Sequence, residues 1–178
     1  ARAGATVSDT ARPDIDTARA FELFILLLRA ATSRRATEEQ QDYFRKVAAD
    51  TKIDGDSYLS RMARGVLLQH RDWLGLDIER AIMRYAWSEF FQDWDILLCP
   101  AAVSAAWPHD QAGERHDRTI TVNGQQQYGV DQMFWAGYPN MVYLLSTVAP
   151  AGQSPEGLPL ALSPEQAAGL AEAVYPQL

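Results

Sequence analysis

The chain has 178 residues and a formal net charge of −7, with 47% hydrophobic and 22% charged residues. This balance is typical of a folded globular protein, and the length fits a single domain over residues 1–178. The acidic balance argues against a nucleic-acid partner, because phosphate binding needs a clustered basic surface. The longest apolar run, Leu23–Leu28, is too short to cross a bilayer, so no membrane partner is expected.

The numbers of cysteines and lysines limit which disulfides and which lysine-dependent reactions are possible. The lone cysteine, Cys99, cannot form an internal disulfide, and residues 1–13 lack the apolar segment of a signal peptide. We therefore expect a cytoplasmic protein. Two lysines against fourteen arginines, together with abundant alanine, indicate a bacterial source and leave two candidates for lysine-dependent chemistry.

The first half of the chain predicts a series of helices. Apolar residues recur at helical spacing over Asp14–Thr32, on a stripe broad enough for a helix covered on more than one side. Thr37-Glu38-Glu39-Gln40 is a capping-box pattern that begins a polar helix ending near Asp50. Further helices are predicted over Ser57–Leu68 and over Leu76–Trp94. One apolar face of the last helix carries Ile78, Ala81, Ile82, Tyr85 and Ala86.

Strands are predicted to be few. Ala3–Val7 indicates a strand or its entry, Asp95–Pro100 a buried strand that ends at the proline, and Leu144–Ala149 another strand. Arg118–Val122 alternates polar and apolar residues and meets Asn123-Gly124, the preferred pair of a type I′ turn. A β-hairpin returning over Gln125–Tyr128 is therefore predicted.

The remaining segments complete the expected order of elements. A short helix is predicted over Val130–Ala136, and a Gly/Pro-rich loop runs to Pro159. Ser163-Pro164-Glu165-Gln166 then opens a last helix with serine as N-cap and proline at the first helical position.

Four motifs in the second half of the chain occur in a specific order. These are Trp87–Pro100, Trp107-Pro108-His109-Asp110, the hairpin through Val122-Asn123-Gly124, and Thr147–Gly152 followed by Gly157-Leu158-Pro159. Their order and spacing resemble the late part of amidase-signature enzymes, and Gly4-Ala5-Thr6-Val7 matches the same family weakly. The resemblance implies an α/β fold, of which this chain is an α+β-like, helix-rich part with a few strands and one β-hairpin.

The resemblance also implies a chemistry that this chain does not carry. Members of the family hydrolyse amides with a Ser–cis-Ser–Lys triad, in which a neutral lysine relays a proton and backbone amides stabilise the oxyanion. The sequence has no Gly/Ser-rich segment like that of the nucleophile, and Lys46 and Lys52 occur in no matching context. No catalytic residue is therefore assigned, and no cofactor is expected.

The C-terminal part departs from the family in two places. Leu144-Leu145-Ser146 stands where members usually have Leu-Pro-Ala. Leu160-Ala161-Leu162 runs almost directly into Ser163-Pro164, where members continue into an apolar strand. A strand bordering the active site is thus expected to be shortened, which puts a normal substrate pocket in doubt.

The substrate-binding candidates follow from the resemblance alone. In the family, the loop after the proline at position 100 and the segment around position 135 lie close to the acyl-binding region. The candidates are Pro100, Ala101, Trp107 and Trp135. The aromatic residues of this region are expected mostly in the core by their helical spacing; they are Trp87, Phe90, Phe91, Trp94, Trp107, Phe134 and Trp135.

The other reactive side chains favour ordinary structural roles. Cys99 ends an apolar segment and is expected to be an inert thiol, and Ser154 lacks the Gly-x-Ser-x-Gly setting of a nucleophile. His109 and His116, with Asp110, Glu114 and Asp117, are weak metal candidates, because loop spacing of this kind is unspecific. We expect a solvated loop without a metal.

Three hypotheses about function remain open. The first is the C-terminal part of an amidase-family hydrolase, inactive alone, which contributes a wall of the substrate pocket for a small amide. Its partner would be a missing N-terminal catalytic half. The alternative is a non-catalytic amidase-like binding or self-association module, which would cover exposed sheet edges by forming a homo-oligomer. The third, an independent metal- or cysteine-dependent enzyme, rests on the weak candidates Cys99, His109 and His116.

Overall fold

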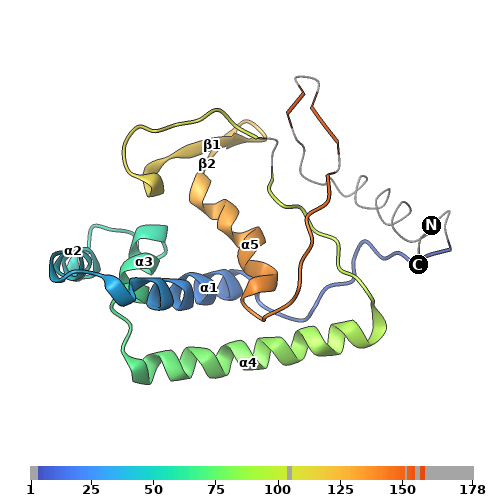
Figure 1. Cartoon of the computed structure of the whole chain (residues 1–178), viewed down its shortest axis with the longest axis horizontal. Helices are drawn as coiled ribbons and strands as arrows, with labels where there is room; N and C mark the ends of the chain where they lie inside the picture. Colours follow the sequence, from blue (N-terminus) through green and yellow to red (C-terminus); the bar gives the residue numbers. More distant parts are fainter. Residues whose placement is uncertain (1–3, 104–105, 151, 155–156, 159–178) are drawn as a thin grey trace. The chain divides into compact units, whose positions relative to one another are not determined.

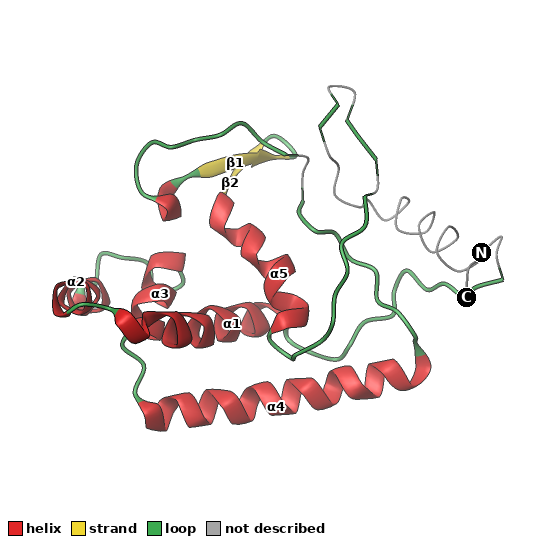
Figure 2. Cartoon of the chain, viewed as in Figure 1, coloured by secondary structure: helices red, strands yellow, loops and turns green. Residues whose placement is uncertain are grey.

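The computed structural model describes residues 4–103, 106–150, 152–154 and 157–158. Five α-helices and one two-stranded antiparallel sheet form within these residues (Figures 1 and 2), as expected for a helix-rich part of an α/β fold. Residues Asp14–Glu89 and Gly137–Leu145 make one compact unit, the helical unit. The described parts of 1–13, 90–136 and 146–178 make a second, the hairpin unit. That the 178 residues form one domain stays a prediction.

Helix α1, Thr17–Thr32, is the centre of the helical unit. It begins three residues after the predicted start, because Asp16 is the N-cap and its Oδ1 accepts hydrogen bonds from the amides of Ala18 and Arg19 at 2.9 and 3.1 Å. Its buried residues point to several sides of the helix, which confirms the prediction from its broad apolar stripe. They are Ala20, Leu23, Ile25, Leu26 and Leu27.

The next two helices begin where their capping residues predict. Helix α2, Glu38–Ala49, has the complete capping box: Thr37 Oγ1 accepts from the Gln40 amide at 3.2 Å, and Gln40 Oε1 accepts from the Thr37 amide at 3.0 Å. Helix α3, Tyr58–Val66, is capped by Ser57, whose Oγ accepts from the Ser60 amide at 3.2 Å. Helix α3 packs against both α1 and α2.

Helix α4, His70–Asp93, begins six residues before the predicted Leu76. The Gln69 carbonyl accepts from the amides of Asp72 and Trp73 at 3.0 and 2.9 Å, so the helical hydrogen bonding already starts in this turn. The buried side of α4 carries Met83 and Trp87. Trp87 packs edge-to-face on Tyr138, with ring centroids 4.8 Å apart.

Helix α5, Met133–Asn140, follows a 3₁₀ turn, η3, over Gly129–Gln132. The predicted helix over Val130–Ala136 is therefore present but is divided between the two elements. The chain leaves α5 through a turn in which the Leu144 amide donates to the Pro139 carbonyl at 3.1 Å. Tyr143 in this turn has a left-handed φ of 62°.

The hairpin forms as predicted. Strand β1, Thr119–Val122, pairs with β2, Gln125–Tyr128, and Val122 faces Gln125 across the turn. Asn123 and Gly124 both have positive φ, 51° and 78°, which is the backbone that a type I′ turn requires. Ile120 on β1 and Val130 on η3 are buried in this unit, at 6% and 2% exposure.

The predictions of three further strands were wrong for the residues that the structure describes. Residues 4–7, 95–100 and 144–149 belong to no strand, and the sheet of the described chain has only β1 and β2. A strand exists only where a neighbour accepts and donates its backbone hydrogen bonds, and no described segment pairs with these three. Their apolar side chains accordingly remain accessible: Ile96, Leu145 and Val148 are 48%, 102% and 78% exposed. The predicted helix after Ser163 and the shortened strand at 160–162 lie outside the described residues.

Candidate functional site

The loop after Pro100 and the segment before α5 are joined in the hairpin unit. The Val103 amide donates a 3.0 Å hydrogen bond to Oε1 of Gln132, across 29 positions of sequence. Pro100 and Ala101 precede Val103 on one segment, and Trp135 follows Gln132 by three residues on the other. Two of the segments that the sequence singled out for substrate binding therefore lie next to each other.

The side chains of these candidates differ in exposure. Pro100 and Trp135 are partly buried, and Ala101 is exposed. The Trp135 ring packs edge-to-face against Phe134, with centroids 5.1 Å apart. Trp107 is 44% exposed, against the expectation that the aromatic set lies mostly in the core, and its predicted place beside the other three candidates stays a prediction.

Gln132 is the residue that sequence reasoning missed. Nothing in its local pattern distinguishes it from the other glutamines of Gln125–Gln132, because its role depends on a hydrogen bond to a distant loop. It lies in η3, where the turn directs its side chain toward the Pro100 loop. The sequence placed Gln132 inside the helix predicted over Val130–Ala136, which gave no signal of this contact.

The histidine cluster does not assemble into a metal site. His109 is exposed, and Nε2 of the partly buried His116 lies 3.7 Å from Oδ1 of its sequence neighbour Asp117. In the part of the chain that the structure describes, no three His, Cys, Asp or Glu side chains are placed to hold a metal ion.

The two candidate nucleophiles are held in unreactive settings. Cys99 is partly buried, and this desolvation raises the pKa of its thiol, which disfavours the nucleophilic thiolate. The Ser154 hydroxyl accepts a 3.3 Å hydrogen bond from the Leu158 amide, and the Ser154 amide donates to the Leu158 carbonyl at 2.8 Å. Ser154 is therefore a turn residue, as expected for an ordinary loop serine.

The two lysines are both exposed on the helical unit. Lys46 lies in the last turn of α2 and Lys52 in the turn that follows. A lysine that acts as a neutral proton relay is desolvated by burial. Neither lysine has that environment.

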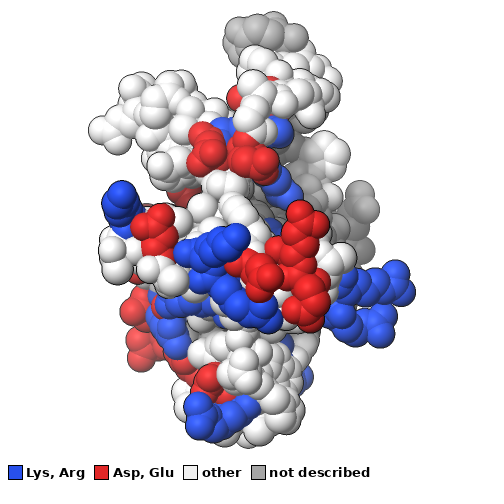
Figure 3. Space-filling view, turned by 90° about the vertical axis from the view of Figure 1, so that its left-hand side faces the viewer, with Lys and Arg blue, Asp and Glu red and all other residues white. Residues whose placement is uncertain are grey.

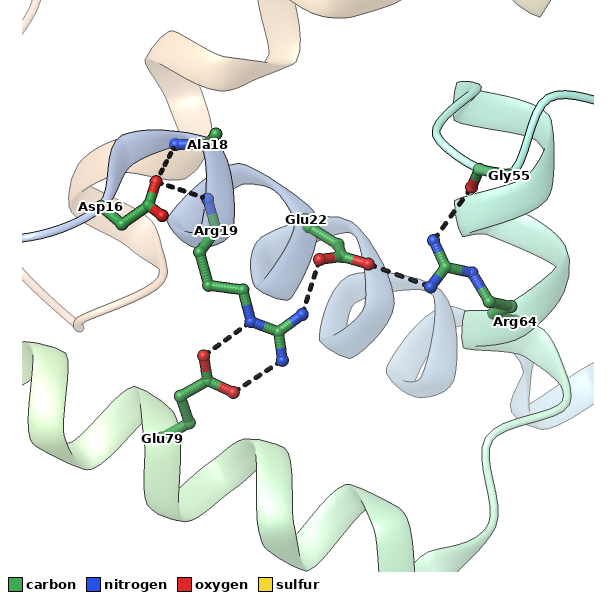
Figure 4. Close-up of polar contacts among 7 residues, drawn as sticks. All are labelled: Asp16, Ala18, Arg19, Glu22, Gly55, Arg64 and Glu79. Atoms are coloured by element: carbon green, nitrogen blue, oxygen red, sulfur yellow. Dashed lines mark hydrogen bonds and ion pairs between the residues drawn. The ribbon is translucent and has the colours of Figure 1, made fainter.

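The most developed polar network is structural and lies in the helical unit (Figure 4). Arg19 of α1 donates from Nε and Nη2 to the two carboxylate oxygens of Glu79 on α4, both at 2.7 Å, and from Nη1 to Glu22 at 2.6 Å. Glu22 also accepts from Arg64 of α3 at 3.0 Å, and Arg64 donates to the Gly55 carbonyl at 3.2 Å. This network connects α1, α3 and α4.

A shallow cavity of about 260 Å³ lies at the junction of α1, α2 and α3 in the helical unit. Arg29, Arg35, Phe44 and Met62 are among the residues that line it. None of the four predicted substrate-binding residues does so. On the face of the molecule shown in Figure 3, basic side chains lie beside acidic ones instead of forming a separate basic region.

The comparisons with known proteins agree with the sequence motifs. A family model described as Amidase matches residues 1–165. Neither a curated protein nor a solved structure matches the chain. No helix among the described residues has the length and apolar character to span a membrane.

Proposed function

The chain belongs to the amidase family, and we propose that it is the C-terminal part of an amidase-family hydrolase, contributing one wall of the substrate pocket. In this proposal the complete enzyme hydrolyses the C–N bond of a small amide. The Ser–cis-Ser–Lys triad comes from a catalytic half that this sequence does not include.

The hydrogen bond from Val103 to Gln132 supports the proposal most directly. It holds the loop after Pro100 against the segment that leads to Trp135, the two segments that the family resemblance connects with acyl binding. Partly buried Pro100 and Trp135 can offer apolar surface to the acyl group of an amide. Exposed Lys46 and Lys52 and the turn-bound Ser154 support the view that proton relay and nucleophile come from elsewhere.

A complementation assay tests this proposal. The chain is mixed or co-expressed with the N-terminal half of a related amidase that carries the Gly/Ser-rich segment, and hydrolysis of simple amides and esters is measured. We expect no turnover from either part alone and turnover from the mixture. Replacing the nucleophilic serine of the supplied half should abolish it.

Pocket variants then test the contribution of this chain. Trp135→Ala should raise KM of the complemented enzyme by roughly tenfold, because a truncated aromatic removes apolar contact with the acyl group. Tyr128→Ala, at an aromatic that is 54% exposed on β2, is the matched control and should leave KM unchanged. Turnover by the chain alone that is lost with Cys99→Ala or with a chelator would contradict the proposal.

A further inference from the structure

The cavity at the junction of α1, α2 and α3 is lined by two chemically different sets of side chains. Phe44 of α2 and Met62 and Val66 of α3 are apolar, whereas Arg29 of α1 and Arg35 of the 3₁₀ turn η1, Ser33–Arg35, are basic. The residues of the described chain that line it include no Asp and no Glu. Positive charge beside apolar surface, without an opposing carboxylate, suits an anion that has an apolar part.

Neither arginine of the cavity is neutralised by the part of the chain that the structure describes. Arg19 and Arg64 of the same unit each pair with a carboxylate, but Arg29 and Arg35 form no ion pair with a described residue. Arg29 donates from Nη2 to the neutral Tyr58 hydroxyl, and the Tyr58 ring centroid lies 5.5 Å from its Cζ. Its Nε is buried and has no hydrogen-bond partner among the described residues, which is uncommon for a buried donor.

The other polar groups of the lining leave one more donor. The hydroxyls of Thr32 and Ser33 donate to carbonyls of α1, at 2.8 and 3.2 Å, so their protons are already used. Oε1 of Gln40 accepts from the Thr37 amide at 3.0 Å in the capping box. The Nε2 group of Gln40 has no partner within the described chain. The side-chain groups that remain for a ligand are therefore two guanidinium groups and one amide NH₂.

The size of the cavity and the donors favour a small carboxylate. A volume of about 260 Å³ is below the roughly 300–1,000 Å³ of pockets for drug-sized ligands, so a single ring or a short chain fills it. A planar carboxylate matches the two-pronged hydrogen bonding of a guanidinium. Inorganic phosphate also binds arginine, but it has no apolar part to contact Phe44, Met62 and Val66.

We propose that this cavity is a binding site for a small carboxylate that carries a compact apolar group, an acid of about the size of benzoate. Arg29 and Arg35 bind the carboxylate, and Phe44, Met62 and Val66 contact the apolar group. The net charge of −7 disfavours general attraction of anions, so saturable binding of an acid reports a local site. Such binding needs no catalytic half and is measured on the full chain alone.

An NMR titration of the isotope-labelled chain with sodium benzoate at constant ionic strength tests this site. Benzoate should bind saturably, with a dissociation constant of roughly 1 mM or below, and should shift the amide signals of residues 32–40 and 62–66. Benzyl alcohol keeps the ring without the charge, and acetate keeps the charge without the ring. Each should bind at least tenfold more weakly. The absence of saturable benzoate binding, or equal binding of benzyl alcohol, would overturn the proposal.

Arg35→Gln tests the charge, because Arg29 also holds Tyr58 and its loss could disturb the fold. The variant should raise the dissociation constant of benzoate by about tenfold. Arg34→Gln is the matched control: Arg34 is the adjacent, exposed arginine, carries the same charge and does not line the cavity. It should leave benzoate binding unchanged. Equal weakening by both variants would mean that the overall charge attracts benzoate, and the assignment to this cavity would fail.

Ala36→Leu tests the location by filling the cavity while both arginines remain. Ala36 lines the cavity and has an extended backbone, with φ −63° and ψ 128°, which leucine also adopts. The variant should raise the dissociation constant of benzoate at least tenfold, whereas Ala48→Leu, at an exposed alanine of α2 outside the cavity, should not change it. Far-ultraviolet circular dichroism should show the same helix content in both variants. Undiminished benzoate binding by a folded Ala36→Leu chain would place the ligand elsewhere and refute the site.

Discussion

Arg19 on α1 and Glu79 on α4 face each other across 60 positions of sequence as a two-pronged ion pair, with both N–O distances 2.7 Å. Their side chains are only about one-third exposed, at 34% and 32%. An ion pair with this geometry is stronger than one with a single contact at the surface, because two parallel hydrogen bonds hold both charged groups in one orientation. The pair attaches the long α4 to the centre of the helical unit.

A double-mutant cycle measures this attachment. Arg19→Met and Glu79→Gln, singly and together, should reveal a coupling free energy of about 1 kcal/mol, at the upper end of the range for partly exposed pairs. Urea unfolding supplies the four free energies. The same cycle on Arg71 and Asp72, an 89% and 50% exposed pair at 3.3 Å, should give a coupling close to zero. Equal coupling free energies for the two pairs would show that the two-pronged geometry of Arg19 and Glu79 adds nothing to stability.

Glu22 makes the stability of the helical unit depend on acid pH. Partial burial by itself would raise the pKa of Glu22, but hydrogen bonds and charge from Arg19 and Arg64 outweigh it, so the net pKa lies below the ordinary 4.5. Because the folded-state pKa is the lower one, the carboxylate stabilises the fold above the unfolded pKa. That contribution is lost as the pH falls through the folded pKa.

Glu22→Gln should therefore lower the free energy of unfolding at pH 7. The difference in free energy of unfolding between this variant and the unaltered chain should shrink as the pH falls below about 4.5. Urea unfolding at pH 7, 5, 4 and 3 gives both curves. Glu38→Gln, at a carboxylate whose side chain is 84% exposed, is the control and should cost almost nothing at pH 7. A constant difference between Glu22→Gln and the unaltered chain over this range would contradict the assignment.

Gly65 allows α3 to approach the backbone of α1. A Cβ at this position would lie 2.8 Å from the Leu26 carbonyl oxygen and 2.7 Å from the Arg29 Cβ, too close for either to be accommodated without movement. Gly65→Ala should lower the free energy of unfolding by about 1–3 kcal/mol, the usual cost of overpacking. Gly75→Ala on α4, where a Cβ meets nothing within 4 Å, should instead stabilise by up to about 1 kcal/mol. Thermal unfolding of Gly65→Ala and Gly75→Ala measures both changes in stability. Equal changes would contradict the close approach of α3 to the α1 backbone.

The parts of the fold that local chemistry determines could be predicted from the sequence. Thr37 and Gln40 close their capping box within one turn, and Asn123-Gly124 forms its type I′ turn without help from distant residues. The strand prediction at Asp95–Pro100 failed for the opposite reason. An apolar run becomes a strand only when another segment supplies its hydrogen bonds, and none of the described segments does.

The site shows the same division. Apolar spacing on α4 revealed a stripe at Ile78 and Ile82, but not which side of the helix the rest of the chain would cover. The family resemblance pointed to Pro100 and Trp135, whereas the residue that brings their segments together, Gln132, carries no signal in its local sequence. Contacts between residues far apart in sequence depend on the folded chain, so local patterns do not contain them.

Gln132 is expected to position the Pro100 loop without contributing much to stability. Val103 is 40% exposed, so Gln132→Ala should change the free energy of unfolding by less than about 1 kcal/mol. Loss of the acceptor should speed hydrogen exchange of the Val103 amide and, in the complemented enzyme, raise KM several-fold with little change in kcat. Gln132→Glu keeps an acceptor oxygen and should restore the slow exchange.

Gln126 offers the matched control for this positioning role. Its Nε2 donates to Thr121 Oγ1 at 2.8 Å within the hairpin, so Gln126→Ala removes a hydrogen bond of similar length that does not involve the Pro100 loop. It should leave both the Val103 exchange rate and KM unchanged. If Gln132→Ala left Val103 exchange unchanged, the loop would be held by other contacts. If both alanine variants raised KM equally, the effect would come from the hairpin unit as a whole and not from the junction of the Pro100 loop with η3.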